Sequence, residues 1–304
     1  MEILQRGNKI ELRGVKNFHI PDVLECGQCF RFEKLGNMQY CLVALDKVLF
    51  AEQNADGLLF WYPNKPLAMT EFNDLWLPYF DLNRDYNAIL TKICENDPVM
   101  TAAAAFAPGI RLLQQEPWET IISFIISQNN RIPQIKKVVK NIARRYGSPI
   151  DEANHAFPTP SQLVLATEDG LRECKTGFRA GYIMDAAQKA ALGHMPLNRD
   201  NTMPTAQLRQ TLLDVRGIGE KVAHCILLFG YGRFDAFPVD TWVQKVMQQY
   251  YFDGKKATGA DIHNFAAQRF GPYSGFAQQY LFHYIRMKSG ENKNKQEILI
   301  EKRA

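Results

Sequence analysis

The chain has 304 residues, of which 46% are hydrophobic and 12% aromatic, enough for a sizeable core in two or three subdomains and too apolar for a disordered chain. The net charge of +4 permits binding to nucleic acid but does not demonstrate it. Among six cysteines only Cys26 and Cys29 lie close together in the sequence, which argues against a zinc site. The lack of a signal peptide or a membrane-length apolar run predicts a cytoplasmic protein, nucleoid-associated if it is bacterial.

Residues 1 to about 65 predict an antiparallel sheet with one covered face. Apolar residues alternate with polar ones, or form short runs, in the segments 9–13, 39–45 and 58–62, with turn residues at 36–37 and 56–57.

The segment 27–32, Gly-Gln-Cys-Phe-Arg-Phe, interrupts this sheet pattern. Gly27 is either a turn or bulge glycine, or a position at which a ligand approaches the main chain closely. The residues alone leave both readings open.

From about residue 70 the spacing of apolar residues becomes helical. The predicted helices are 71–77, 83–94 and the amphipathic segment 118–126. Pro133 fits the first turn of a further helix, whose basic face is either solvated or follows a row of phosphates. That face consists of Lys136, Lys137, Lys140, Arg144 and Arg145.

Three features lie between these helices and the central motif. Asn129 follows the helix 118–126, a common place for asparagine. Ser161 is a plausible cap after a turn-rich connection. Phe178 and Arg179 open another helix, and they suit either an apolar wedge beside a minor-groove arginine or a buried phenylalanine next to a surface arginine.

Residues 205–247 carry the most informative pattern. A helix ends near Leu213, a tight turn contains Gly217 and Gly219, and a second helix begins at once with Lys221. Free N–H groups at such a helix start favour an anion such as a phosphate. Asp240 follows nineteen residues after the lysine and begins another helical segment.

Two further helices are predicted at 261–270 and 274–287. Gln278 and Phe282 share a face of the second, and without other information they are a surface glutamine and a core phenylalanine. Residues 289–304 are charged and predict a frayed tail.

The segments Val215–Ala223 and Phe237–Asp240 resemble the helix–hairpin–helix motif of the DNA glycosylase superfamily that is defined by this hairpin and a Gly/Pro…Asp pattern. The segment 27–31 resembles that of 8-oxoguanine DNA glycosylases with AP lyase activity. The resemblance implies an α+β fold: an N-terminal antiparallel β-rich domain (1–100) packed on a two-part helical body (101–288), then a charged tail (289–304).

For the base pocket, the resemblance implies that the Gly27 carbonyl accepts a hydrogen bond from N7–H of 8-oxoguanine, which guanine lacks. Gln278 would read the Watson–Crick edge and Phe282 would stack on the ring. Pro238 and Cys225 would line the same pocket, although a small core residue explains Cys225 equally well.

For the chemistry, the resemblance implies that Lys221 displaces the base at C1′ and forms a Schiff base, after which β-elimination nicks the strand. Its place near the positive end of a helix disfavours the ammonium form. Asp240 would stabilise positive charge on the sugar and cap its own helix.

For the DNA, the resemblance implies that Asn129 fills the gap left by the base and pairs with the orphaned cytosine. Phe178 would wedge beside the gap and Arg179 would contact the estranged base. Eukaryotic members carry an arginine where this chain has Gln134, which puts strict preference for cytosine in doubt.

The hairpin of Gly217 and Gly219 would hold the phosphates of double-stranded DNA containing oxidised guanine. The carbonyls of Leu213, Val215 and Ile218 would hold a monovalent or divalent cation, no other cofactor is required, and the protein would be a monomer.

Two alternatives remain at this stage. One is a relative that acts on other damaged or alkylated bases, and the other is a non-catalytic DNA-binding module. Lys221 together with Asp240 argues against the module, because a DNA clamp needs neither.

Overall fold

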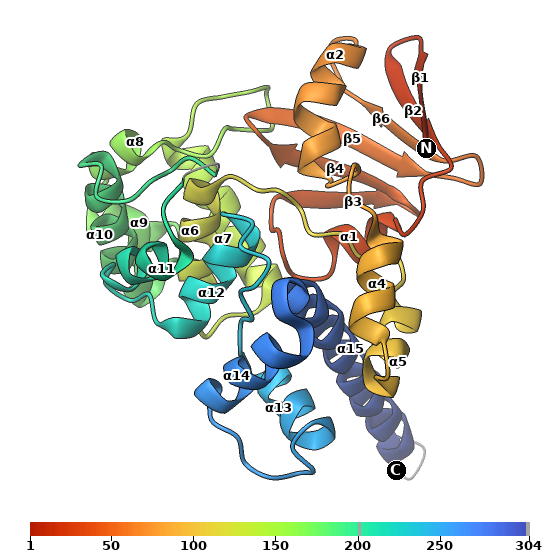
Figure 1. Ribbon diagram of the computed structural model, residues 1–304. Helices are drawn as coiled ribbons and strands as arrows, with labels where there is room; N and C mark the ends of the chain where they lie inside the picture. Colours follow the sequence, from red (N-terminus) through yellow and green to blue (C-terminus); the bar gives the residue numbers. More distant parts are fainter. Residues whose placement is uncertain (200–201, 302–304) are drawn as a thin grey trace.

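The computed structural model describes residues 1–199 and 202–301, with side chains described as far as residue 289. An antiparallel sheet forms one part of the molecule and a helical body the other (Figure 1). In the described part of the chain, no helix combines the length and the apolar character that crossing a membrane requires.

The N-terminal sheet has the strand order β1-β2-β6-β5-β4-β3 within the described residues, and every neighbouring pair is antiparallel. The strands are β1 (Glu2–Arg6), β2 (Lys9–Arg13), β3 (Phe32–Gly36), β4 (Gln39–Ala44), β5 (Lys47–Gln53) and β6 (Leu58–Trp61). The predicted sheet is confirmed; the pattern singled out β2, β4 and β6 but not β1, β3 or β5.

One face of the sheet is covered by apolar side chains, as expected from the alternation. The short helix α1 (Ile20–Leu24) and a continuous helical stretch contribute to this sheet core, in which Phe60 contacts Phe72 and Phe80. That stretch comprises α2 (Met69–Glu71), a π-helical turn η1 (Phe72–Trp76) and α3 (Leu77–Tyr79).

The helical body has a second, larger apolar core and two groups of helices. The first group comprises α6 (Pro117–Ser127), α7 (Ile132–Tyr146), α8 (Pro160–Val164), α9 (Glu168–Glu173), η2 (Gly177–Arg179), α10 (Ala180–Ala191), α11 (Thr205–Leu213) and α12 (Glu220–Phe229). The second comprises α4 (Tyr86–Cys94), α5 (Pro98–Phe106), α13 (Thr241–Tyr250), α14 (Gly259–Phe270), η3 (Gly271–Tyr273) and α15 (Ser274–Glu301).

Several local expectations need correction. Helix α6 is buried on nearly all sides rather than on one face, because α7, α10 and α12 pack around it. The cap of α8 is Thr159, not Ser161, since Thr159 and Gln162 form a reciprocal capping box. Helix α15 extends into the charged segment as far as Glu301, residues 302–304 lie outside the described residues, and the frayed tail stays a prediction.

Candidate functional site

The hairpin between α11 and α12 forms as predicted, and its first glycine is sterically required. Gly217 has a φ of +82°, and a Cβ there would lie 2.2 Å from the ring of Tyr182. Gly219 is the N-cap of α12, and a Cβ on it would meet nothing within 4 Å. The turn therefore packs tightly on one side and leaves open space beside Gly219 at the start of α12.

Polar contacts from α10 hold this hairpin in place. Asp185 accepts hydrogen bonds at 2.8 Å from the main-chain N–H of Arg216 and from Nζ of Lys189. Lys189 also donates to the carbonyl of Asp214 at 2.6 Å. The loop that begins α12 is thus fixed to the helix that follows Phe178.

A cleft with a cavity volume of about 490 Å³ lies among the segment after α1, the α6–α7 junction, α12, the loop before α13 and α15. Residues predicted from widely separated parts of the sequence converge on it. They are Gly27, Lys221, Cys225, Pro238, Asp240, Gln278 and Phe282.

Asp240 caps α13, as predicted, and faces the cleft. Its carboxylate accepts hydrogen bonds from the N–H groups of Trp242 at 3.0 Å and Val243 at 2.8 Å. Burial raises the pKa of Asp240, while these bonds and the Lys221 ammonium oppose the rise. The site therefore holds a partly desolvated carboxylate near an amine.

Lys221 enters the cleft from the first turn of α12 and is half-buried. Its Nζ lies 5.6 Å from the centroid of the Phe124 ring. Cys225, one turn later, is buried, and burial raises the pKa of its thiol although Lys221 acts in the opposite direction. Since the thiol stays protonated at neutral pH, Cys225 lines the cleft as a small, nearly neutral side chain.

The wall around Gly27 contains an arginine that the sequence patterns did not single out. Arg286 Nη2 donates to the Glu25 carbonyl at 2.7 Å, and its guanidinium lies 5.2 Å from the centroid of the Phe282 ring. Gly27 has a φ of +90°, and a Cβ there would lie 3.1 Å from Arg286 Nη1 and 3.3 Å from Phe282 Cε1. The only available signal was the spacing of Phe282 and Arg286, one helical turn apart.

Gln278 is buried rather than on the surface, with 4% of its area exposed. Among the described residues its Oε1 has no hydrogen-bond partner, although it is itself buried. An unpaired buried acceptor is costly unless a partner arrives. Its neighbour Gln279 instead donates to the Cys26 carbonyl at 3.1 Å and helps hold the Gly27 segment.

The residues assigned to the gap in DNA lie at the α6–α7 junction and at η2. Asn129 is exposed with a φ of +47°, and Phe178 is 58% exposed. Arg179 is buried, so the surface alternative is wrong for it. Its Nε donates to the Gln128 carbonyl at 2.9 Å and its Nη2 to the Asn129 carbonyl at 3.1 Å.

Arg179 therefore supports the Asn129 loop from within the protein, and its contact with an estranged base stays a prediction. Gln134 is exposed on the first turn of α7. Arg131, which occupies the N-cap position of that helix without a side-chain capping bond and lines the cleft, is an exposed cation that the sequence patterns did not single out.

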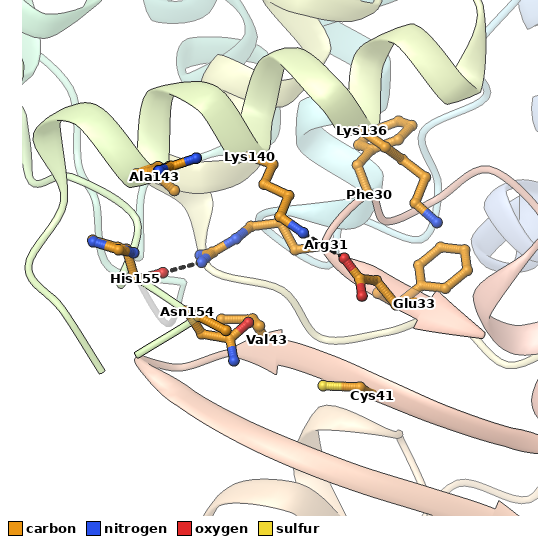
Figure 2. Close-up of a pocket in the computed structure, with 13 residues that line it drawn as sticks. Phe30, Arg31, Glu33, Cys41, Val43, Lys136, Lys140, Ala143, Asn154 and His155 are labelled. Atoms are coloured by element: carbon orange, nitrogen blue, oxygen red, sulfur yellow. Dashed lines mark hydrogen bonds and ion pairs between the residues drawn. The ribbon is translucent and has the colours of Figure 1, made fainter. Parts of the chain in front are cut away.

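Several cations of the basic face of α7 contact other side chains of the protein. Figure 2 shows a second, smaller cavity between α7 and the sheet, in which Lys140 extends to Glu33 and bonds to it at 2.6 Å. Lys136 lies 3.7 Å from the centroid of the Phe32 ring, and Arg145 pairs with Glu173. This cavity lies between the sheet and the helical body, and these three cations join parts of the protein.

The predicted cation position consists only of main-chain oxygens. The Val215 carbonyl already accepts a hydrogen bond from Ile218 N–H at 3.0 Å. Among the described residues, no group of three or more histidine, cysteine or carboxylate side chains gathers to hold a metal. Carbonyl oxygens are suitable ligands for hard cations. The binding of a cation by the carbonyls of Leu213, Val215 and Ile218 stays a prediction.

Comparison with known proteins divides the chain into two matches. Residues 12–121 match the family model described as 8-oxoguanine DNA glycosylase, N-terminal domain. Residues 122–272 match the model of the HhH-GPD superfamily base excision DNA repair protein.

Individual relatives agree with these matches. A probable N-glycosylase/DNA lyase of Methanothermobacter thermautotrophicus is 30% identical over 230 residues, covering 68% of this chain and 72% of the relative. The N-glycosylase/DNA lyase OGG1 of Arabidopsis thaliana is 28% identical over 285 residues, covering 86% and 76%. The crystal structure of the Clostridium acetobutylicum 8-oxoguanine glycosylase/lyase with DNA containing cytosine opposite 8-oxoguanine has a TM-score of 0.89 at 36% identity, covering 95% and 99%.

Proposed function

Because the chain belongs to the 8-oxoguanine DNA glycosylases of the HhH-GPD superfamily, we propose that its cleft excises the damaged base with Lys221 as the nucleophile. The protein is an N-glycosylase and DNA lyase of base excision repair. One observation carries the assignment of the site: an amine, a carboxylate and the base-reading residues line one cleft although about 250 residues separate Gly27 from Phe282.

The reaction begins with a nucleotide turned out of the duplex, because an enzyme cannot reach C1′ of a stacked base. The unprotonated amine of Lys221 attacks C1′ as the bond to the base breaks, and the base leaves with the bonding electrons and takes up a proton. Asp240, held by two N–H groups, stabilises the positive charge that develops on the sugar.

The covalent adduct then opens the sugar ring to an iminium ion at C1′. Loss of a C2′ proton expels the 3′ phosphate with its bonding electrons, which nicks the strand. The iminium acts as the electron sink for this step, and for that reason the same lysine serves both activities.

Selectivity comes from donors that the lesion has and guanine lacks. N7 of 8-oxoguanine carries a hydrogen, whereas N7 of guanine has a lone pair that a carbonyl repels. Gly27 is our candidate for that carbonyl. The unpaired Oε1 of Gln278 supports a second contact, to the N–H donors of the Watson–Crick edge. Because guanine and 8-oxoguanine share these donors, this contact selects a guanine-type base and leaves the discrimination between the two to N7.

Around the nucleotide, Phe178 and Asn129 enter the gap in the duplex while the hairpin holds the backbone. We expect a monomer to act on one lesion at a time. The presence of Gln134 supports excision opposite bases other than cytosine, since the arginine of eukaryotic relatives is missing. A DNA substrate also fits the cytoplasmic location, nucleoid-associated if the protein is bacterial, that the sequence predicts.

Borohydride trapping tests the proposal on duplexes that carry one 8-oxoguanine opposite each of the four bases. The wild type should form a covalent adduct in more than one pairing, and Lys221→Gln should bind the DNA without forming one. Lys65→Gln removes an exposed lysine outside the cleft and should trap like the wild type. An adduct in Lys221→Gln, or excision confined to alkylated or pyrimidine lesions, would contradict the proposal.

A further inference from the structure

Two histidines that the proposed reaction does not use stack beside the loop 237–240, which precedes α13. His224 lies on α12, three residues after Lys221, and His263 lies on α14. Their ring centroids are 4.3 Å apart with an angle of 18° between the planes. Both side chains are at least half-buried, so they belong to the packing between helices rather than to the surface.

Both imidazoles bind the main chain of one residue, Phe237. The Phe237 N–H donates to Nδ1 of His224 at 3.3 Å, and the Phe237 carbonyl lies 3.0 Å from Nε2 of His263. The first bond requires an unprotonated Nδ1, and the second requires a proton on Nε2 because a carbonyl only accepts. The first bond therefore specifies a neutral His224 with its proton on Nε2. The second specifies a proton on Nε2 of His263, and burial, which lowers the pKa of His263, favours its neutral form.

Phe237 directly precedes Pro238 and lies three residues before Asp240, and both of these residues line the cleft. The Phe237 side chain is buried and stacks on Phe270 of α14 at 6.4 Å. His224 thus connects this loop to the helix of the nucleophile, and His263 connects it to α14. The two bonds hold the peptide groups on either side of Phe237, and rotation of these groups would displace both the pocket wall and the carboxylate.

We infer that His224 and His263 are positioning residues for the reaction. They hold the main chain of Phe237 and thereby place Asp240 relative to Lys221. The inference rests on the proposed roles of Asp240 and Lys221. Neither histidine touches the substrate in this scheme, and the pair acts only through the loop.

The charged groups around the pair leave it neutral. Glu220 on α12 lies 4.0 Å from Nε2 of His224, and Glu220 is itself paired with Arg209 of α11. On His263 of α14 the same two groups act from α11 and α12. Burial first, and then the neighbouring ring, lower the pKa of His224 to about 4, which agrees with the neutral form that its bond from Phe237 N–H requires.

The test compares substitutions of His263 that differ in one hydrogen bond. His263→Phe keeps an aromatic ring against His224 but removes the donor to Phe237. His263→Gln can place an amide N–H where Nε2–H was. Single-turnover excision of 8-oxoguanine, equilibrium binding of lesion DNA and thermal unfolding are measured for each.

We expect His263→Phe to lower the single-turnover rate constant by about tenfold, equivalent to ~1.4 kcal/mol of the barrier, with Kd changed less than about twofold. His263→Gln should recover most of the rate. Equal losses in both variants in proportion to their loss of Tm would mean that the pair only packs, and an unchanged rate in His263→Phe would also overturn the inference.

A second measurement does not depend on activity. Imidazole ¹⁵N spectra of the wild type at neutral pH should show His224 and His263 as neutral rings protonated on Nε2. Another tautomer of His224 in an active enzyme would overturn the positioning role of the two histidines but leave the proposed function intact. Correct tautomers in an enzyme that cannot excise 8-oxoguanine would overturn the proposed function, and with it the role in positioning.

Discussion

Replacing Gly27 by alanine tests whether the segment after α1 distinguishes 8-oxoguanine from guanine. Gly27 has a φ of +90°, which L-residues rarely adopt. The new Cβ would lie 3.1 Å from Nη1 of Arg286 and 3.3 Å from Cε1 of Phe282. The substitution therefore combines backbone strain with a close contact at the ring expected to stack on the base.

The strain alone is worth ~1–2 kcal/mol for an L-residue in this region. Turning the peptide would relieve the strain but re-aim the Gly27 carbonyl, and shifting Phe282 would relieve the contact but tilt its ring. If most of this energy is lost from lesion-specific binding, the preference for 8-oxoguanine over guanine should fall by a factor of about 5–30.

The assay is equilibrium binding to two duplexes, with 8-oxoguanine or guanine opposite cytosine, in a Lys221→Gln background that prevents turnover. Gly193→Ala is the matched control, because Gly193 has a φ of +74° with nothing within 4 Å of an added Cβ. Both alanine variants should lose thermal stability, Gly27→Ala at least as much as Gly193→Ala because of its additional close contacts. Only Gly27→Ala should lose the preference between the duplexes.

The reasoning is refuted if Gly27→Ala keeps the wild-type ratio of the two Kd values while its thermal stability falls as in Gly193→Ala. That result would show that the main chain at Gly27 is strained by alanine without reading the base. An equal loss of preference in Gly193→Ala would point to a general loosening of the fold instead.

Three further expectations follow from the charges in the site. Burial raises the Asp240 pKa, so the folded state binds that proton more tightly than the unfolded state, and the ionised carboxylate lowers the stability at neutral pH. Asp240→Asn keeps the cap and should retain or increase the free energy of unfolding measured in urea. Its single-turnover excision rate should fall ~10²–10³-fold. The pKa of His224 is lowered from 6.5 to about 4, so the stability that the neutral ring contributes is fully present above pH 6.5 and is lost as the pH falls towards 4. Between pH 7.5 and 5 the free energy of unfolding of the wild type should therefore fall by about 2 kcal/mol more than that of His224→Asn. Equal falls in the two proteins would contradict a lowered His224 pKa. The Kd for lesion DNA should rise steeply with salt because phosphate contacts release counterions, and a flat response in a salt titration would argue against the hairpin clamp.

Local chemistry made much of the site predictable. A tight turn between two helices needs a glycine where φ is positive, and Gly217 occupies that position. An aspartate at the start of a periodic segment is a strong cap, and Asp240 caps α13. Such signals depend on a few neighbouring residues, so one sequence is enough to read them.

Contacts between distant segments could not be read in this way. Nothing near Arg286 indicates that its guanidinium bonds to Glu25, because the fold alone brings α15 to that turn. The same holds for the stacked His224 and His263. The burial of Arg179, which neither alternative for it included, escaped the sequence for a related reason: its partners are main-chain carbonyls of a distant loop, and any residue type supplies such a carbonyl.

The cleft draws its parts from opposite ends of the polypeptide. Gly27 lies in the segment matched by the N-terminal family model, Lys221 and Asp240 lie in the superfamily segment, and Phe282 lies beyond both. Mutations that alter which damaged nucleobase is accepted can therefore arise at Gly27 or Phe282, far along the chain from the residues that break the bond. Evolution of new lesion ranges in this architecture does not have to pass through inactive ancestors.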